Sequence, residues 1–197
     1  MQIIIVGGGN VGSTLTEQLS KEGHNITVID KVADKVETIA NQCDVMGIVG
    51  NGASFNVQNE AGIEHADLLI AVTTSDELNL LCCLIAKKAG NCHTIARVRN
   101  PVYSKEIAYI KEELGLSMVI NPEQAAALEI SRLLKFPSAI KVDTFAKGRV
   151  ELLKCRVVEG SPLCNRSLID ISASLRCDVL VCAVEREIGR ASCRERV

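Results

Sequence analysis

The chain has 197 residues, of which 47% are hydrophobic and 23% are charged, a composition typical of a globular protein with a substantial core. Its 22 basic and 24 acidic residues give a net charge of −2, which argues against a protein that binds nucleic acid through bulk positive charge. The apolar stretches, such as residues 80–86, are far shorter than the roughly 18 residues that a membrane span requires. The N-terminus has neither a basic region nor a small-residue cleavage site, so no signal peptide is visible there.

Short apolar strands alternate with helices along the first 135 residues. The predicted strands cover residues 2–6, 26–30, 45–49, 67–72, 93–98 and 117–120, and the predicted helices cover residues 12–22, 32–41, 74–89, 100–114 and 123–135. Six strands that alternate with helices predict an α/β fold with a Rossmann-like, doubly wound parallel sheet. We place this domain at residues 1–137, because Phe136-Pro137-Ser138 breaks the pattern.

The remaining residues predict a smaller, strand-rich domain. Strands are expected over 139–145, 150–158 and 178–184, with a short helix over 168–175. This gives a small α+β domain at 138–187, which is too short to be a full substrate domain. Residues 188–197 are Arg-rich and follow neither period, which favours a non-native tail over a basic interaction tail.

The nine cysteines and three histidines do not predict a metal site. No Cys-x-x-Cys pair occurs, and the histidines are not spaced as metal ligands. We therefore interpret the cysteines as small buried hydrophobic residues in a reducing compartment.

A glycine-rich motif follows the first predicted strand directly. Gly7, Gly9 and Gly12 form the pattern G-x-G-x-x-G, and a predicted helix begins inside it. In such a loop the first glycine allows a tight turn, the second lets the backbone approach a pyrophosphate, and the third permits close packing of helix on strand. The free amides at the start of the helix favour a phosphate, so the glycine loop is a candidate phosphate site.

Asp30 ends the second predicted strand, 18 residues after Gly12. A carboxylate at this place accepts hydrogen bonds from ribose hydroxyls and repels a 2′-phosphate, which disfavours NADP. The loop and Asp30 together predict a site for an adenosine that carries phosphates. They do not separate NAD from ATP or ADP.

The ends of the next three strands should line the same crevice. Asn51 and Gly52 follow the third strand, where they could contact the adenine side of a ligand. Thr73 and Thr74 follow the fourth strand and offer hydroxyls to a phosphate or a ribose, although Thr74 could instead cap the helix in the capping-box pattern Thr-Ser-Asp-Glu.

The fifth predicted strand ends with Arg97 and Arg99, which share one face of the sheet. One of these guanidinium groups could pair with a phosphate, and the alternative is a surface salt bridge.

No catalytic constellation accompanies the candidate site. The pattern Tyr-x-x-x-Lys is absent, because Ile107 follows Tyr103 and Glu113 follows Tyr109 at that spacing. The histidines lack an obvious carboxylate partner. We therefore predict no catalytic residue and a nucleotide-binding module that is not an enzyme. An NAD-dependent dehydrogenase is the alternative, and a scaffold for another transporter or channel is a third possibility.

Several segments together resemble the family of regulator-of-K⁺-conductance domains. They are MQIIIVGGGNVG, VIDKVADKV, VGNGAS, DLLIAVTTSDELN, ARVRNPVY and INPEQAAALEISRLLKFPSA. The resemblance is strong over residues 1–137. Residues 138–187 resemble the first part of the small C-terminal ligand domain of that family, which stops here after about half its expected length, so that domain is truncated. Members commonly carry two such units in tandem, so we expect this chain to be part of a longer protein.

The resemblance implies a regulatory subunit on the inner face of the cell membrane. Such a subunit is cytoplasmic and peripheral, binds NAD(H) or an adenine nucleotide (ATP or ADP), and gates the membrane subunit of a Trk-type potassium transporter. The nucleotide contacts that it implies are Gly7–Val11, Asp30, Asn51, Gly52, Thr73, Thr74 and Arg97. Some ATP-dependent relatives place an Arg where this chain has Asn10, which favours NAD(H).

The resemblance also implies a homo-oligomer, in which dimers that pair through residues 123–135 build a tetrameric or larger ring. The sequence supports this independently, because Ala126, Ala127, Ile130, Leu133 and Leu134 form a stripe wider than one core face would use. Glu123 matches a position that binds a divalent cation in some relatives. No partner carboxylate is visible, so we interpret it as a first-turn glutamate and predict no metal.

Overall fold

The structure is a computed structural model that describes residues 1–136, 139–146, 149–164, 166–167, 180–186 and 189–191. The chain forms two compact units, Met1–Leu128 and Glu129–Val197. The boundary between these units falls inside the helix α6 (Pro122–Lys135).

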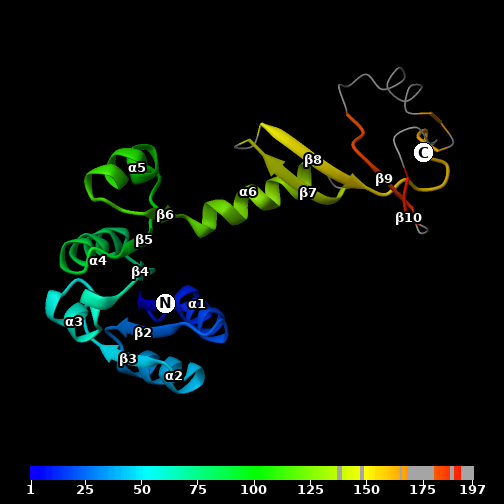
Figure 1. The fold of residues 1–197 in the computed structure, drawn as a ribbon. Coiled ribbons are helices and arrows are strands. Elements are labelled where there is room, and N and C mark those ends of the chain that lie inside the picture. The colour runs from blue at the N-terminus through cyan, green and yellow to red at the C-terminus, as the bar shows by residue number, and fades with distance from the viewer. Residues whose placement is uncertain (137–138, 147–148, 165, 168–179, 187–188, 192–197) are drawn as a thin grey trace. The chain divides into compact units, whose positions relative to one another are not determined.

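The first unit is built on a six-stranded sheet with the strand order β3-β2-β1-β4-β5-β6, in which every neighbouring pair is parallel (Figure 1). Its strands are β1 (Gln2–Val6), β2 (Asn25–Asp30), β3 (Met46–Val49), β4 (Leu68–Ala71), β5 (His93–Arg97) and β6 (Met118–Ile120). The order reverses between β1 and β4, which confirms the predicted Rossmann-like, doubly wound sheet.

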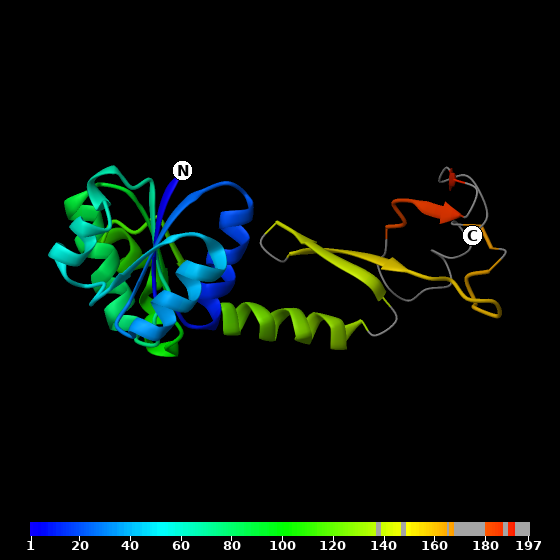
Figure 2. The ribbon, with the colours of Figure 1, turned by 90° about the horizontal axis from the view of Figure 1, so that it is seen from below.

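Helices cover both faces of this sheet (Figure 2). They are α1 (Asn10–Lys21), α2 (Ala33–Cys43), α3 (Phe55–Glu60), the 3₁₀ turn η1 (Ile63–His65), α4 (Asp76–Ala89) and α5 (Pro101–Glu113). Helix α6 (Pro122–Lys135) follows β6, and none of its residues is buried. Side chains of α1 and α2 join the hydrophobic cluster on one face, and those of α3, α4 and α5 join the cluster on the other.

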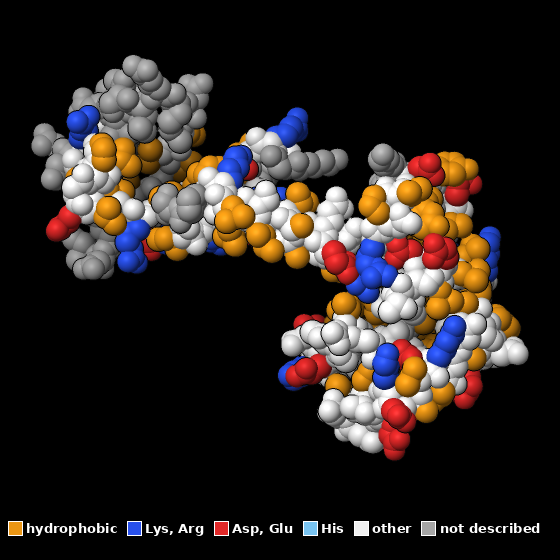
Figure 3. Space-filling model, turned by 180° about the vertical axis from the view of Figure 1, so that it is seen from behind, with side chains coloured by type: hydrophobic (Ala, Val, Ile, Leu, Met, Phe, Trp, Pro, Cys, Tyr) orange, Lys and Arg blue, Asp and Glu red, His pale blue; other side chains and the backbone are white. Residues whose placement is uncertain are grey.

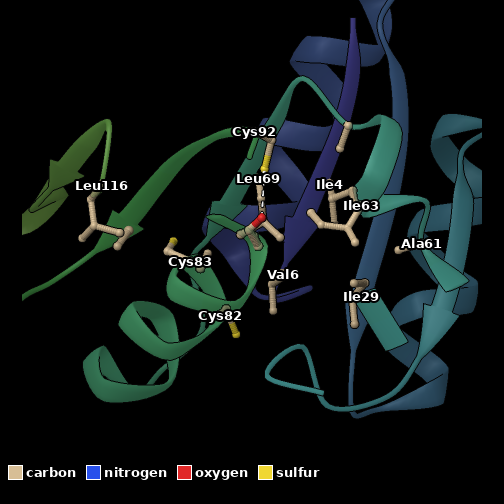
Figure 4. Packing of buried hydrophobic residues seen from close by; sticks show 14 of the residues in the cluster. Ile4, Val6, Ile29, Ala61, Ile63, Leu69, Cys82, Cys83, Cys92 and Leu116 are labelled. Atoms are coloured by element: carbon tan, nitrogen blue, oxygen red, sulfur yellow. Dashed lines mark hydrogen bonds between the residues drawn. The ribbon is translucent and has the colours of Figure 1, made fainter. Parts of the chain in front are cut away.

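The central strand β1 supplies both clusters. Ile3 and Ile5 face α1 and α2, whereas Ile4 and Val6 face α4 in the cluster shown in Figure 4. A parallel strand buried on both faces explains why its sequence is continuously apolar instead of alternating.

Three cysteines belong to this core. Cys82, Cys83 and Cys92 are buried. Burial raises the pKa of the Cys82 thiol to about 12, and it also raises the pKa values of Cys83 and Cys92. These three are uncharged at neutral pH, which confirms the interpretation of them as small buried hydrophobes. It does not hold for Cys155 and Cys182, which are exposed.

The second unit contains two small antiparallel pairs among its described residues. Strand β7 (Ala139–Phe145) pairs with β8 (Val150–Cys155), and β9 (Val184–Arg186) pairs with β10 (Gly189–Ala191). The predicted strand over 178–184 is wrong for residues 180–183, where Leu180 is exposed and β9 begins only at Val184. The predicted helix over 168–175 lies outside the described residues. Among the described helices, none is both long and apolar enough to cross a membrane.

Candidate functional site

The glycine loop joins β1 to α1 at the carboxyl edge of the sheet. Gly7 has a φ of +113°, and a Cβ placed on it would lie 2.9 Å from the amide nitrogen of Thr73. A Cβ on Gly12 would lie 1.8 Å from the carbonyl oxygen of Gly7. The fold itself therefore requires both glycines, one for the turn and one for the close approach of α1.

Gly9 differs from its neighbours in the motif. It is the N-cap of α1 with ordinary extended backbone angles, and a Cβ placed on it would meet nothing within 4 Å. No side chain caps the first turn of α1 at this residue. The fold leaves this position open, and an open cradle in front of helix amides fits an anionic group.

The other loop residues are divided between core and solvent. Gly8 is buried, and a Cβ placed on it would lie 3.1 Å from Cδ1 of Ile39; Val11 packs against the cluster on the α1 side of the sheet. Asn10 is exposed at the first position of α1.

Asp30 fastens this loop to the end of β2. Its Oδ2 accepts a hydrogen bond of 2.6 Å from the Gly8 amide, and its Oδ1 accepts one of 2.9 Å from the Val32 amide. A carboxylate oxygen has two lone pairs, so each can accept a further hydrogen bond. Contact with a ribose stays a prediction, and the structure adds a second role for Asp30 in shaping the loop.

The turn after β3 lies over the end of β1. A Cβ on Gly52 would lie 2.1 Å from Cγ1 of Val6, so only glycine fits there. Gln58, fully buried, donates from Nε2 to the carbonyl oxygens of Gly52 at 2.7 Å and Cys82 at 3.0 Å. Asn51 is exposed beside this turn, and its Oδ1 accepts a bond from the Ala53 amide at 3.2 Å.

The turn after β4 corrects one expectation. Ser75, not Thr74, caps α4, because the helix begins at Asp76 and its cap must be the residue just before. The Ser75 hydroxyl oxygen accepts a bond of 3.2 Å from the Leu78 amide. The side chain of Thr74 is exposed, whereas the Thr73 hydroxyl donates to Oδ1 of Asn79 at 2.7 Å.

Both arginines at the end of β5 have acidic partners. Arg97, whose side chain is only 12% exposed, pairs with Glu123 in the first turn of α6, whose side chain is 52% exposed, so the predicted salt bridge forms and is exposed on its acidic side. Arg99 donates to the Thr74 carbonyl oxygen and lies with its Nε 3.6 Å from Oδ1 of Asp76. Contact of either guanidinium group with a phosphate stays a prediction. The guanidinium group would have to bind the phosphate in addition to its present partner or in place of it.

The Arg97 pair also changes the titration of Glu123. Burial raises the pKa of Glu123, but its own backbone amide, the Arg97 hydrogen bond and the charges of Arg97 and Arg99 outweigh burial. The net effect is a pKa below the ordinary value of 4.5.

A hollow of about 440 Å³ opens between the ends of β4 and β5. It is lined by Thr74, Ser75, Asp76, Glu77, Arg99 and Asn100. A second hollow of about 350 Å³ lies at the opposite edge of the sheet, beside Gln2 and Asn25. Ligands of doubly wound sheets bind at the carboxyl edge, so the first hollow is the one that extends the candidate site.

Sequence reasoning missed Asp76 and Asn79, although a signal was present. They share a face of α4 with Cys83 and Ala86, at spacings of three and four residues. A polar residue on an otherwise buried face indicates a specific hydrogen-bond role.

Among the described residues, no group of three or more His, Cys, Asp or Glu side chains is arranged to hold a metal ion.

The fold and the glycine loop define a Rossmann-like domain with a candidate phosphate cradle at its switch point. Residues 3–122 match the family model described as the TrkA-N domain. The chain belongs to the TrkA-N domain family.

Two curated relatives illustrate the extent of the similarity. The Trk system potassium uptake protein TrkA homolog of Archaeoglobus fulgidus is 39% identical over 171 residues, which cover 87% of this chain and 39% of the relative. The Trk system potassium uptake protein TrkA of Halomonas elongata is 38% identical over 170 residues, covering 85% and 37%. This chain therefore spans about two fifths of the length of these relatives.

Solved structures share the fold. The TrkA-N domain of the inner membrane protein ybaL from Escherichia coli has a TM-score of 0.60 at 28% identity and covers 68% of this chain and 96% of its own. The GsuK channel bound to NAD has a TM-score of 0.57 at 18% identity, covering 87% of this chain and 30% of that one, which shows the fold alone.

Proposed function

We propose that this chain is a regulatory module of a Trk-type potassium uptake system and that NAD(H) is its ligand. The observation that carries the proposal is the glycine loop, with Gly9 open in front of α1 and Asp30 holding the Gly8 amide at the end of β2. Asp30 disfavours a 2′-phosphate, so the unphosphorylated ribose of NAD(H) fits better than NADP. The names of the curated relatives support the potassium-uptake role.

Adenine nucleotides are the second candidate ligands. The same loop and Asp30 would hold the adenosine and phosphates of ATP or ADP, and a GsuK channel bound to ADP has the same fold. Two carboxylates and one guanidinium line the hollow beyond the phosphates, which makes it less favourable for further phosphate charge. This favours NAD(H).

The proposed module works by binding and not by catalysis. Its membrane partner is the transporter's membrane subunit, and its place is the cytoplasmic face of the cell membrane. We assign nucleotide binding to residues 1–137 and a truncated ligand domain to 138–187, with 188–197 as a non-native tail. A coupling free energy of about 1–3 kcal/mol between nucleotide and transporter would suffice for regulation.

The proposed assembly is a homo-oligomer that pairs through α6. No residue of this helix is buried within the chain, and Ile130, Leu133 and Leu134 are all more than half exposed. Figure 3 shows hydrophobic side chains along the helix that joins the two units. Exposed leucines on one stripe favour pairing with a second copy, and such dimers would build the tetrameric or larger ring.

Calorimetric titration with NADH, NADPH, ADP and ATP tests the ligand. We expect NADH to bind more tightly than NADPH, and Gly9→Ala to weaken NADH binding at least tenfold, because the new methyl group would occupy the space of the phosphate. Gly9→Ala should leave thermal unfolding of the free protein almost unchanged, and Ser20→Ala at the far end of α1 is the matched control. Tighter binding of NADPH, or full NADH affinity in Gly9→Ala, would contradict the proposed site.

Potassium flux tests the regulatory role separately. A Trk-type membrane subunit in liposomes is assayed with and without this chain, at zero and saturating NADH. Flux that changes with NADH only when the chain is present supports regulation, and flux indifferent to both would refute it.

A further inference from the structure

Helix α4 carries two buried polar side chains one turn apart, at the carboxyl edge of the sheet. Asp76 is 6% exposed and Asn79 is fully buried. Burial of a carboxylate or an amide costs free energy unless hydrogen bonds compensate it. The partners of these two side chains therefore indicate what they do.

Asn79 links the ends of β4 and β5. Its Oδ1 accepts bonds from the amide and the hydroxyl of Thr73 at 2.8 and 2.7 Å. Its Nδ2 donates to the carbonyl oxygens of Thr73 at 3.3 Å and Arg97 at 2.9 Å. The backbone ladder between these strands ends at Ala71 and Ala96, so Asn79 extends their connection beyond the last paired residues.

Asp76 fixes the loop that follows β5. Its Oδ2 accepts the backbone amides of Arg99 at 2.8 Å and Asn100 at 2.7 Å. Its Oδ1 lies 3.6 Å from Nε of Arg99, whose other end reaches the Thr74 carbonyl oxygen. One carboxylate thus sets the backbone of this loop and the direction of the Arg99 side chain.

The segments held by these two residues adjoin the glycine loop. The amide nitrogen of Thr73 is so close to Gly7 that a Cβ there would lie 2.9 Å from it. Across the sheet, the candidate site runs from Asp30 on β2, over the glycine loop after β1, to the ends of β4 and β5. Asp76 and Asn79 hold the part of the candidate site that lies at the ends of β4 and β5.

We infer that Asp76 and Asn79 are positioning residues for the half of the site at the ends of β4 and β5. The inference rests on the proposed nucleotide function, and neither side chain has to touch the ligand. Both act through Thr73, Arg97, Arg99 and Asn100, whose backbone they hold.

Two ligands of different reach test this role. In the proposed site, AMP would occupy only the adenosine and phosphate part near Asp30 and the glycine loop, whereas NADH would also extend towards the ends of β4 and β5. We expect Asn79→Ala and Asp76→Ala to weaken NADH binding about tenfold and AMP binding less than twofold. Asp76→Asn keeps an oxygen for the two loop amides and should retain most of the NADH affinity.

Leu69→Ala serves as the stability control. Leu69 is a fully buried residue in the middle of β4, so its truncation lowers thermal stability without touching the strand ends. It should leave the ratio of NADH to AMP affinity unchanged. An equal loss of both ligands in Asn79→Ala and Leu69→Ala would overturn the positioning role, because it would show a general effect of instability.

Amide hydrogen exchange in the free protein tests the positioning role of Asp76 and Asn79 separately from the proposal that NADH is the ligand. Asp76→Ala should accelerate exchange at the Arg99 and Asn100 amides, and Asn79→Ala at the Thr73 amide, each more than in Leu69→Ala. If the parent chain binds no NADH, the proposed ligand is wrong. If it binds NADH and the variants keep both that affinity and slow exchange at these amides, the positioning inference is wrong.

Discussion

At the scale of single residues, the glycine motif divides into positions that the fold needs and one that it leaves open. Gly7 and Gly12 are forced by backbone contacts, and Gly52 by Val6, whereas a side chain at Gly9 would meet nothing. The motif in the sequence predicts the loop but cannot separate these roles, because the atoms that crowd Gly7 and Gly52 come from distant parts of the chain. The same holds for Asp30, whose bond to Gly8 joins residues 22 apart.

Gly12→Ala tests the fold-required class. The new Cβ would overlap the Gly7 carbonyl oxygen at 1.8 Å, and backbone on both sides leaves little freedom to yield. We expect the free energy of unfolding to fall by about 3 kcal/mol, measured by urea denaturation without ligand. Gly9→Ala is the matched control and should lose less than about 1 kcal/mol. Equal denaturation midpoints for Gly12→Ala and the parent would refute this division of roles.

At the scale of elements, periodicity predicted the six strands of the sheet and the helices α1, α2, α4, α5 and α6, with ends that differ by one or two residues. The ends depend on individual caps, and α4 shows this, because Ser75 and not Thr74 holds its first turn. The candidate site was partly predictable, since the ends of parallel strands must meet at one edge. Asp76 and Asn79 were missed because their partners are mostly backbone atoms of segments six to 24 residues away.

The ion pair between Arg97 and the first turn of α6 predicts a pH dependence. Folding lowers the pKa of Glu123 below 4.5, so its contribution to stability is complete above that pH and is lost as the pH falls through the lowered pKa. Glu123→Gln should cost about 1 kcal/mol at neutral pH, a modest value because the carboxylate is half exposed. Urea denaturation at a series of pH values measures the difference from the parent.

The pH series also contains its own check. The difference between Glu123→Gln and the parent should disappear at acidic pH, where the parent's Glu123 is protonated too. Glu37→Gln on the exposed surface of α2 controls for the loss of one negative charge. A difference that stays constant at every pH would show that Glu123 does not contribute through its ionised form.

The exposed stripe on α6 predicts how the chain assembles. Ile130→Glu combined with Leu133→Glu places two charges on the stripe, where a second copy would bury them unpaired. Light scattering at ~100 μM should show a dimer or larger species for the parent and a monomer for the double variant. Ala125→Glu, on the other side of the helix, should leave the assembly intact. A monomeric parent would disprove this interface.

At the scale of the whole molecule, the buried hydrophobic residues within the described ranges all come from the first unit, between Ile3 and Leu116. The second unit instead exposes apolar side chains on the two-stranded sheet of β7 and β8, such as Ile140, Phe145 and Val150. Isolated two-stranded sheets are marginally stable, and the curated relatives are more than twice as long as this chain. The first unit therefore carries the stability and the candidate site.

Because the first unit carries the candidate site, its side chains decide the last prediction, that the chain binds NADH without oxidising it. Hydride transfer to a carbonyl needs a general acid near the substrate oxygen, with a pKa suited to the task. At the described strand ends, Asp30 holds two backbone amides and Asp76 holds two more, while the guanidinium groups of Arg97 and Arg99 do not release protons near neutral pH. Glu77 also lines the hollow, but hydrogen bonds from its own backbone amide, Ser75 and Tyr103 lower its pKa, so it is ionised and holds no proton to donate at neutral pH. Binding alone should stabilise the fold by about 2.7 kcal/mol at a hundredfold excess of NADH over Kd. We therefore expect a clear thermal shift with NADH, together with background absorbance changes against aldehydes, ketones and quinones. Steady turnover that Gly9→Ala abolishes would favour the dehydrogenase alternative, because contamination would not respond to a change in this loop.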